Sequence, residues 1–387
     1  MAAWKQGGKG PCTHLIVTGC LPQRYREGLE EALPEVDLFL GISEAPHIAR
    51  RLDDLLNVPE VTGSRRHRSI IGEPTFLMNA GHRRLVSTTL PSAYLKIADG
   101  CSNRCSYCVI PDIRGAARSR GIDDVVREAA NLAGQGVREL IITAQDTTAY
   151  GRDLKGRPTL STLLNELARV DGIAWIRLLY TYPAHLTEEL LRTIADEPKI
   201  CNYLDIPIQH GDDAILRAMR RQGDTALIRA AVAKTRSIIP DVALRTSIIV
   251  GFPGETARRF ENLLAFIREI RFDHLGVFPY SREEGTEAAA IPARISEREK
   301  ERRRGLVMEE QAQISREINS ALIGTDQECL IEGKSDLAGY IHVGRCRRQA
   351  PEIDGVTHLR GGSRSPGTIA TCRIIAADEY DLFAELT

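Results

Sequence analysis

Hydrophobic positions in the middle of the chain follow two alternating periods. Short, nearly continuous apolar runs typical of buried strands occur at 93–99, 139–145, 176–182, 203–209, 244–252 and 274–280. Between them lie longer stretches with apolar residues every three to four positions, such as TLSTLLNELARV and ARRFENLLAFIREI, which predict amphipathic helices. Strands that alternate with helices predict an α/β fold with a parallel sheet. Six units are too few for a closed eight-stranded barrel, so we expect an open, partial (β/α)6 barrel.

The segments on either side of this core have different patterns. HLIVTGC reads as a further strand followed by the helical YREGLEEALPEV, which predicts a small α/β domain over residues 1–69. The basic stretch GSRRHRSIIGEP then leads to the core, which we expect over 87–319. The core ends in one long charged helix over 296–320, whose charges we interpret as a solvated face. From 321 to 387, short strand-like pieces broken by glycines predict a small all-β barrel of about five strands, similar to OB-type barrels.

Composition narrows the class of protein. The 387 residues carry a formal net charge of -1, so no overall field attracts nucleic acid. No run of about 18 apolar residues predicts a membrane span, and the N-terminal MAAWKQGGKGPC lacks the apolar stretch of a signal peptide. We therefore expect a cytoplasmic protein of two or three domains without membrane contact. In that reducing compartment, cysteines more often bind metal or do chemistry than form disulfides.

Three of the nine cysteines are clustered in KIADGCSNRCSYCVIPDIRG, directly after the first strand of the core. Because sites in parallel α/β structures lie at the carboxyl ends of strands, we expect Cys101, Cys105 and Cys108 on that face. A structural zinc site needs four ligands, and the sequence has no second CxxC and no suitably spaced histidine pair. A [4Fe–4S] cluster held by three thiolates instead leaves one iron open for a cofactor or substrate. Gly100 permits the tight exit from the strand that such a loop requires.

Residues at the ends of later strands are candidates for the rest of a site. Gln145 follows the second strand, and Gln209 follows the fourth. Gly251, in IIVGFPGET after the fifth strand, would let the backbone approach a cofactor closely, but a strand–turn–helix start capped by Thr256 explains that segment as well. Arg245 is a charge inside an apolar strand, and its partner is either a cofactor carboxylate or a neighbouring acid.

With the aromatic Tyr107 before its third cysteine, the CxxxCxxC loop resembles the cluster motif of the radical S-adenosylmethionine (SAM) superfamily. The resemblance implies a [4Fe–4S] cluster whose open iron binds SAM, so that the radical chemistry belongs to the cofactor and not to protein side chains. It also implies the metal ligands Cys101, Cys105 and Cys108. The candidate cofactor-binding residues are then Tyr107, Gln145, Gln209, Arg245 and Gly251.

The order of domains and several further segments resemble the methylthiotransferases of that superfamily. VTGCLPQRY, YLDIPIQH, RTSIIVGFPGET and APEIDG…ADEYDLF look most like the RimO type. The resemblance implies methylthiolation of the β-carbon of an aspartate in small-subunit ribosomal protein twelve, a TRAM-type barrel at the C-terminus, and an external electron donor and sulfur source. Two alternatives stay open: methylthiolation of an adenosine in transfer RNA, and a non-catalytic iron–sulfur protein whose barrel only binds a partner.

The charge of the C-terminal barrel bears on the choice between a protein and an RNA substrate. Residues 324–387 contain ten Asp and Glu against seven Lys and Arg, a net charge of -3. RNA affinity comes largely from the neutralisation of phosphates, which needs a basic surface. A mildly acidic barrel therefore favours a basic ribosomal protein, and we expect no binding of nucleic acid.

The N-terminal domain departs from the family pattern. The family carries a second [4Fe–4S] cluster there, also on three cysteines, and only Cys20 in VTGC matches one of these ligands. Cys12 lies ahead of the strand that ends near Cys20, roughly 20 Å away at about 3.3 Å per residue, too far to share a cluster. We therefore expect a truncated N-terminal domain and one cluster in this chain, with its capacity for sulfur insertion left open.

Overall fold

The computed structural model describes residues 12–26, 28–57, 69–82, 84, 86, 91–292 and 294–387. Most of the expected basic linker, at 63–68, and the expected start of the core at residue 87 lie outside these described residues. The chain forms two compact units. One contains Met1–Met78, Asp99–Asn103 and Val109–Arg118, and the other contains Asn79–Ala98, Arg104–Cys108 and Ser119–Thr387.

The first unit has the small α/β character predicted for the N-terminal part of the chain. Its parallel sheet has the order β1 (Ile16–Thr18), β2 (Leu38–Leu40), β3 (Ser69–Ile70). Its helices are α2 (Cys20–Tyr25), α3 (Gly28–Ala32), the short 3-10 helix η1 (Ile42–His47), α4 (Ile48–Asn57) and α5 (Ile110–Arg114). Leu29, Val36 and Phe39 form its apolar core. Strands β2 and β3 and helix α4 have no counterpart in the prediction.

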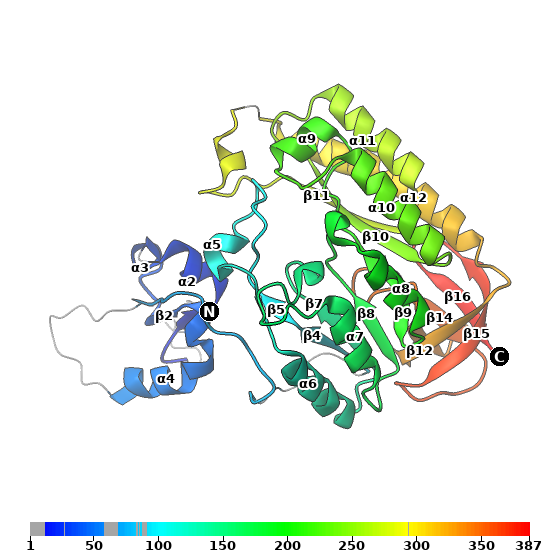
Figure 1. Ribbon diagram of the computed structural model, residues 1–387, viewed down its shortest axis with the longest axis horizontal. Helices are drawn as coiled ribbons and strands as arrows, with labels where there is room; N and C mark the ends of the chain where they lie inside the picture. The colour runs from blue at the N-terminus through cyan, green and yellow to red at the C-terminus, as the bar shows by residue number, and fades with distance from the viewer. Residues whose placement is uncertain are drawn as a thin grey trace. The chain divides into compact units, whose positions relative to one another are not determined.

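The second unit is built around one open parallel sheet of six strands (Figure 1). Its order is β11 (His274–Pro279), β10 (Ala243–Val250), β9 (Ile200–Asp205), β8 (Trp175–Leu178), β7 (Glu139–Thr143) and β4 (Ser92–Lys96). Each strand therefore pairs with the strand before it in this series, as Leu95 does with Ile142 across β4 and β7. Strands β4 and β11 form the two edges, which confirms the partial (β/α)6 barrel. Two further short strands, β5 (Ala98–Asp99) and β6 (Arg118–Ser119), flank the cysteine loop in sequence.

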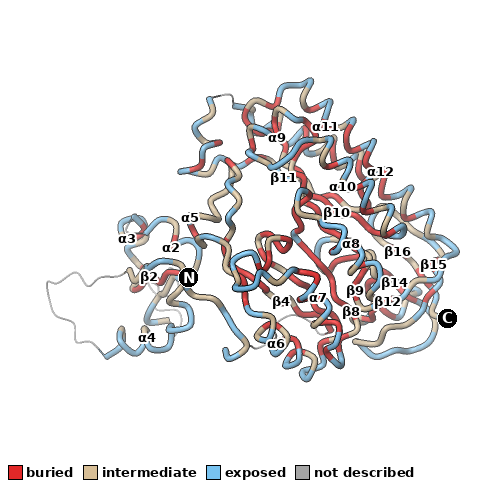
Figure 2. The backbone as a smooth tube through the Cα atoms, viewed as in Figure 1, coloured by how far each residue is buried: buried red, intermediate tan, exposed pale blue. Residues whose placement is uncertain are grey.

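Helices that follow the strands cover one face of this sheet (Figure 1). They are α6 (Ile122–Gly134), α7 (Leu160–Ala168), α8 (Glu188–Asp196), α9 (Asp213–Ala218), α10 (Thr225–Ile238) and α11 (Ala257–Ile270). The 3-10 helices are η2 (Thr147–Ala149), η3 (Pro183–His185) and η4 (Glu287–Ala290). Apolar residues of the strands and of the inward helix faces, such as Leu95, Leu163 and Phe266, form the main core. Figure 2 shows this concentration of buried positions on the sheet and the adjoining helix faces.

The opposite face of the sheet packs against the C-terminal barrel. Ile141, Trp175 and Tyr203 on the strands share an apolar cluster with Leu330 and Ala350 of the barrel. The barrel is closed, with the order β12 (Asp326–Lys334), β13 (His342–Cys346), β14 (Thr357–Arg360), β16 (Leu382–Leu386) and β15 (Ile369–Ala377). The predicted barrel of about five strands is confirmed.

Helix α12 (Glu297–Ser320) connects the core to the barrel, as predicted. The expectation that its charges form a solvated face is wrong for Lys300 and Arg303, which are buried. Lys300 Nζ donates to the Tyr280 carbonyl oxygen at 2.7 Å, and Arg303 pairs with Glu255 at 2.7 Å. The protein can bury these two cations because each has a hydrogen-bond acceptor or a counter-charge. Among the helices in the described ranges, none combines the length and apolar character needed to cross a bilayer.

Candidate functional site

The three cysteines predicted to bind a cluster lie on the loop between β5 and α5. Cys101, Cys105 and Cys108 are all partly exposed. Thiols are the donors that iron–sulfur clusters require, so the chemistry of this loop fits such a cluster. In the described part of the chain, no three His, Cys, Asp or Glu side chains already converge on a position that would hold a metal ion.

Gly100 sets the backbone at the start of this loop. Its φ is +77°, in the left-handed region. A Cβ at this position would lie 2.2 Å from the Ala116 carbonyl oxygen and 2.6 Å from that of Gly115. The N–H of Cys101 donates to the same Gly115 oxygen at 3.0 Å. The prediction that Gly100 permits a tight exit from the strand is therefore confirmed.

Ser106 anchors the middle of the loop to the rest of the second unit. Its N–H donates to the Met219 carbonyl oxygen at 3.0 Å, and its hydroxyl donates to that of Ala218 at 2.7 Å. Its own carbonyl oxygen accepts from the Ala288 N–H at 2.9 Å. Three contacts to two separate segments hold the backbone between Cys105 and Cys108 in place.

Arg221 adds a positive charge beside this loop, and no motif in the sequence pointed to this residue. Its guanidinium lies 3.8 Å from Cys105 Sγ and 4.0 Å from the ring centre of Tyr182, and it donates to the Pro207 carbonyl oxygen at 2.6 Å. Such a cation would compensate part of the negative charge of a thiolate ligand. Burial raises the pKa of Tyr107 well above its ordinary value, so this residue is a neutral phenol.

The two glutamines predicted as site residues both follow strands of the main sheet. Gln145 follows β7, and its Oε1 atom is buried with no hydrogen-bond partner in the described residues. An orphaned buried oxygen fits a site that a ligand completes. Gln209 follows β9 with a φ of +74°, which is uncommon for a residue with a side chain. Its backbone bonds to Ser247 and Ile249 of β10, at 2.9 and 2.8 Å, hold it there.

Arg245 has acidic partners within the protein. Its Nη1 atom lies 2.9 Å from Asp205 Oδ1, and its Nε atom lies 3.5 Å from Asp354 Oδ1. The hydroxyl of Tyr203 donates to the other oxygen of Asp354 at 2.7 Å. Of the two partners considered from the sequence, the structure therefore supplies the neighbouring acid. Asp354 belongs to the C-terminal barrel, 109 positions along the chain, and sequence reasoning missed it.

Gly251 begins the turn after β10. Its φ is +76°, and an added Cβ would lie 2.3 Å from Lys300 Cγ. Its N–H donates to Glu255 Oε2 at 2.8 Å, and that buried carboxylate is also 3.4 Å from His210 Nε2. Thr256 caps α11 by accepting from the Arg259 N–H. The segment is thus both a helix start and a tightly held turn.

A pocket of about 210 Å³ opens beside this turn. Gly251, Tyr280, Arg282 and Lys300 are among the residues that line it. Glu255 holds the turn and is itself contacted by His210 and Arg303, and none of these three residues is among those that line the pocket. A short glycine turn followed by a helix start is a feature that sequence can reveal, whereas its attachment to α12 is not.

Cys20 lies in the first unit, at the start of α2. Its side chain is exposed, and Arg114 Nη2 donates to its sulfur at 3.3 Å. Arg114 also pairs with Asp99 at 3.2 Å.

Comparison with known proteins identifies two parts of the chain. The model of the Radical SAM superfamily matches residues 95–267, and the TRAM domain model matches residues 323–387. The solved structure of TsrM from Kitasatospora setae, a radical S-adenosylmethionine methyltransferase with cobalamin and a [4Fe–4S] cluster bound, superposes with a TM-score of 0.55. The match covers 70% of this chain and 58% of that chain at 16% sequence identity, which shows a shared fold.

Relatives that match over the whole chain identify the family. The ribosomal protein uS12 methylthiotransferase RimO of Syntrophus aciditrophicus (strain SB) is 61% identical, over 100% of this chain and 84% of the relative. The protein of the same name from Geobacter sulfurreducens is 50% identical, over 100% of this chain and 85% of the relative. The chain therefore belongs to the RimO family of radical SAM methylthiotransferases.

Proposed function

We propose that this chain transfers a methylthio group to the β-carbon of an aspartate in ribosomal protein uS12. The observation that carries the proposal is the match, over the full chain, to relatives named as uS12 methylthiotransferases. The open (β/α)6 sheet with a CxxxCxxC loop after its first strand supports it, because a radical SAM enzyme needs both.

The proposed ligands of a [4Fe–4S] cluster are Cys101, Cys105 and Cys108. With SAM bound, such a cluster supplies the one-electron cleavage of the cofactor that activates an unreactive C–H bond. Gln145, with its orphaned oxygen, and Gly251, beside the 210 Å³ pocket, are proposed to contact SAM.

Three further residues have more limited roles in the proposal. Tyr107 and Gln209 remain candidate SAM contacts because they lie on the cysteine loop and at a strand end. Arg245 is better described as a residue that links the sheet to the C-terminal barrel, because it pairs with Asp205 of β9 and with Asp354 of the barrel. Cys20 is proposed as a ligand of a second cluster in the first unit.

A ribosomal protein is the substrate that the acidic C-terminal barrel favours over transfer RNA. Each cleavage of SAM consumes one electron, and each product gains one sulfur atom. The proposal therefore includes an external electron donor and a sulfur source. We also propose that the reaction takes place in the cytoplasm, because uS12 is a ribosomal component.

The test is reconstitution of the purified chain with iron and sulfide, followed by reduction in the presence of SAM. Formation of 5′-deoxyadenosine is the expected result. An intact cluster without 5′-deoxyadenosine would instead favour a non-catalytic iron–sulfur protein that binds a partner. Mass spectrometry of uS12 and of transfer RNA from a deletion strain separates the two substrates, and loss of the modification from the nucleoside alone would contradict the proposal.

A further inference from the structure

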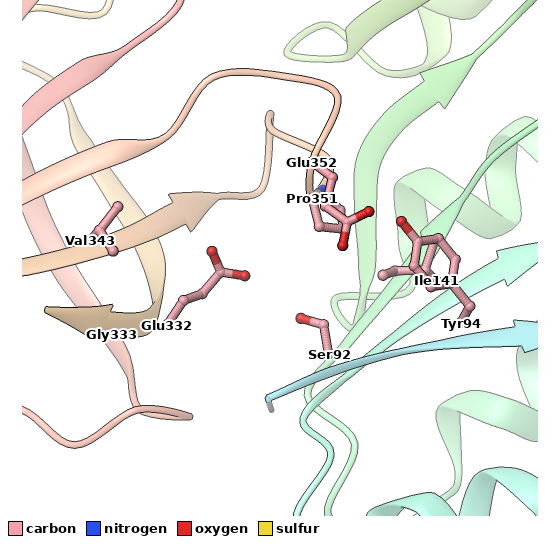
Figure 3. Close-up of a pocket in the computed structure, with 8 residues that line it drawn as sticks. All are labelled: Ser92, Tyr94, Ile141, Glu332, Gly333, Val343, Pro351 and Glu352. Atoms are coloured by element: carbon pink, nitrogen blue, oxygen red, sulfur yellow. The ribbon is translucent and has the colours of Figure 1, made fainter. Parts of the chain in front are cut away.

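A pocket of about 280 Å³ lies between the sheet and the C-terminal barrel, both in the second unit. Ser92, Tyr94 and Ile141 line it on the sheet side (Figure 3). Pro351 and the two acidic residues Glu332 and Glu352 line it on the barrel side. These residues differ from those proposed to contact SAM, so the pocket is a separate site.

The carboxylates of Glu332 and Glu352 both point into this pocket (Figure 3). Glu332 Oε1 lies 2.8 Å from Arg345 Nη2, and Arg345 also pairs with Glu139. Arg177 in turn pairs with Glu139 at 2.8 Å. Two arginines thus balance Glu139 and Glu332. In the described part of the chain Glu352 has no such cation, which leaves the pocket with one uncompensated negative charge.

The loop that carries Glu352 is held in a costly conformation. Glu352 has a φ of +68°, in the left-handed region, where residues with side chains are uncommon. Two residues further on, Asp354 fixes the loop by accepting from the Ala350 N–H at 2.8 Å and from the Tyr203 hydroxyl at 2.7 Å. A strained residue held between fixed neighbours indicates that the position of this carboxylate has a use.

Tyr94 completes a site with the chemistry for an organic cation. Burial, followed by the nearby charge of Glu352, raises the pKa of Tyr94, so its ring stays a neutral phenol facing that carboxylate. A neutral aromatic ring attracts an ammonium or guanidinium group, and carboxylates accept its hydrogen bonds. Ile141 and Pro351 offer apolar contact to the methylene stem of such a side chain.

We propose that this pocket binds a lysine or arginine side chain of the ribosomal protein substrate. The inference rests on the proposed function, because it assumes a basic protein as the partner. A phosphate group would meet two carboxylates here and be repelled, so the site does not suit RNA.

The position of the pocket limits which basic residue can use it. Ser92 begins β4 and Lys96 ends it, so the strand spans about 13 Å at roughly 3.3 Å per residue. The reaction is expected at the carboxyl end of the strands, beyond that span. An extended substrate segment would therefore place its cation roughly four to six residues from the aspartate that reacts.

The test is the affinity of the full-length chain for purified uS12, measured by fluorescence anisotropy at two salt concentrations. Glu352→Gln removes the unpaired charge and should weaken binding about fivefold to tenfold, with a shallower salt dependence. Glu385→Gln is the matched control, because Glu385 is an exposed barrel carboxylate paired with Arg360 and does not line the pocket. Thermal unfolding of each variant checks that the barrel is still folded.

Replacement of single Lys and Arg residues of uS12 by Gln sharpens this test. Replacement of one basic residue within about six positions of the reactive aspartate should weaken the binding of uS12 to the unmodified chain. The same replacement should not weaken binding to the Glu352→Gln variant any further. Equal binding of uS12 by the unmodified chain and the variant would overturn the pocket while leaving the proposed function intact. Failure of the unmodified chain to bind uS12 would overturn both the pocket and the proposed function. Both would also be overturned if the chain bound transfer RNA instead of uS12 and Glu352→Gln weakened that binding.

Discussion

Arg345 of the C-terminal barrel forms a buried ion pair with Glu139 at the start of β7, with 2.5 Å between Nη2 and Oε2. The two side chains are 1% and 0% exposed and lie 206 positions apart in the chain. Burial alone would raise the pKa of Glu139, but the charges of Arg177 and Arg345 lower it to about 2. This pair joins the barrel to the sheet, and Arg345 also pairs with Glu332, which lines the pocket.

Glu139→Gln should strongly destabilise the second unit. The substitution leaves Arg177 and Arg345 buried without their shared counter-charge, which typically costs about 3–5 kcal/mol. Urea unfolding followed by circular dichroism measures the change. The control is Asp326→Asn, which breaks the exposed pair with Arg373 and should cost less than about 1 kcal/mol. Equal midpoints for the two variants would contradict the structural role of the buried pair.

The lowered pKa of Glu139 predicts that the second unit loses stability in acid. The pKa of Glu139 is about 2 in the folded chain and about 4.5 when unperturbed, so the unfolded state binds its proton first as the pH falls. The ionised carboxylate therefore contributes about 3 kcal/mol to the free energy of unfolding above about pH 5, and this contribution is lost progressively towards pH 2. Urea midpoints measured between pH 6 and pH 3 should fall more steeply for the unmodified chain than for Glu139→Gln. Parallel curves would show that this carboxyl titrates normally.

Single replacements of Cys101, Cys105 or Cys108 by Ala should each remove the cluster. Two thiolates do not hold a cube that needs three, so the visible absorbance and the SAM cleavage of the reconstituted chain should disappear together. Cys201→Ala is the control, because that thiol is buried among apolar side chains of the sheet. It should keep the cluster at a packing cost on the order of 1–3 kcal/mol. Full cleavage by Cys105→Ala would disprove the ligand assignment.

Gly100→Ala should distort the cysteine loop without touching a ligand. Its new methyl group would meet the Ala116 carbonyl oxygen at 2.2 Å in a backbone conformation that alanine avoids. Iron content after reconstitution should therefore fall well below that of the unmodified chain. Gly121→Ala is the matched control, because a Cβ there meets nothing within 4 Å. Normal iron content in both variants would mean that the loop adapts to the methyl group.

The fold could be predicted from the sequence where local pattern decides it. Apolar runs of strand length and the helical spacing between them placed all six strands of the main sheet, and glycine-broken strands placed the barrel. These features depend on residues that are neighbours in the chain, so their period is visible without the structure.

The contacts that organise the site could not be predicted, because their partners are far apart in the chain. Arg245 meets Asp354 through the docking of the barrel, and Glu255 meets Arg303 through the packing of α12. The spacing of charges along α12 does not reveal which side chains are exposed and which pair with a buried carboxylate. Only the packed helix distinguishes Lys300 from its exposed neighbours.

Transfer of hydrogen from the substrate to the cofactor product tests the proposed methylthiolation of uS12 most directly. The reconstituted chain is reduced with SAM and with uS12 whose aspartates carry deuterium at the β-carbon, and the 5′-deoxyadenosine formed is analysed by mass spectrometry. We expect 5′-deoxyadenosine that contains deuterium, and none of it in the Cys105→Ala variant. Formation of 5′-deoxyadenosine without deuterium, at a rate that uS12 does not change, would contradict the proposed methylthiolation.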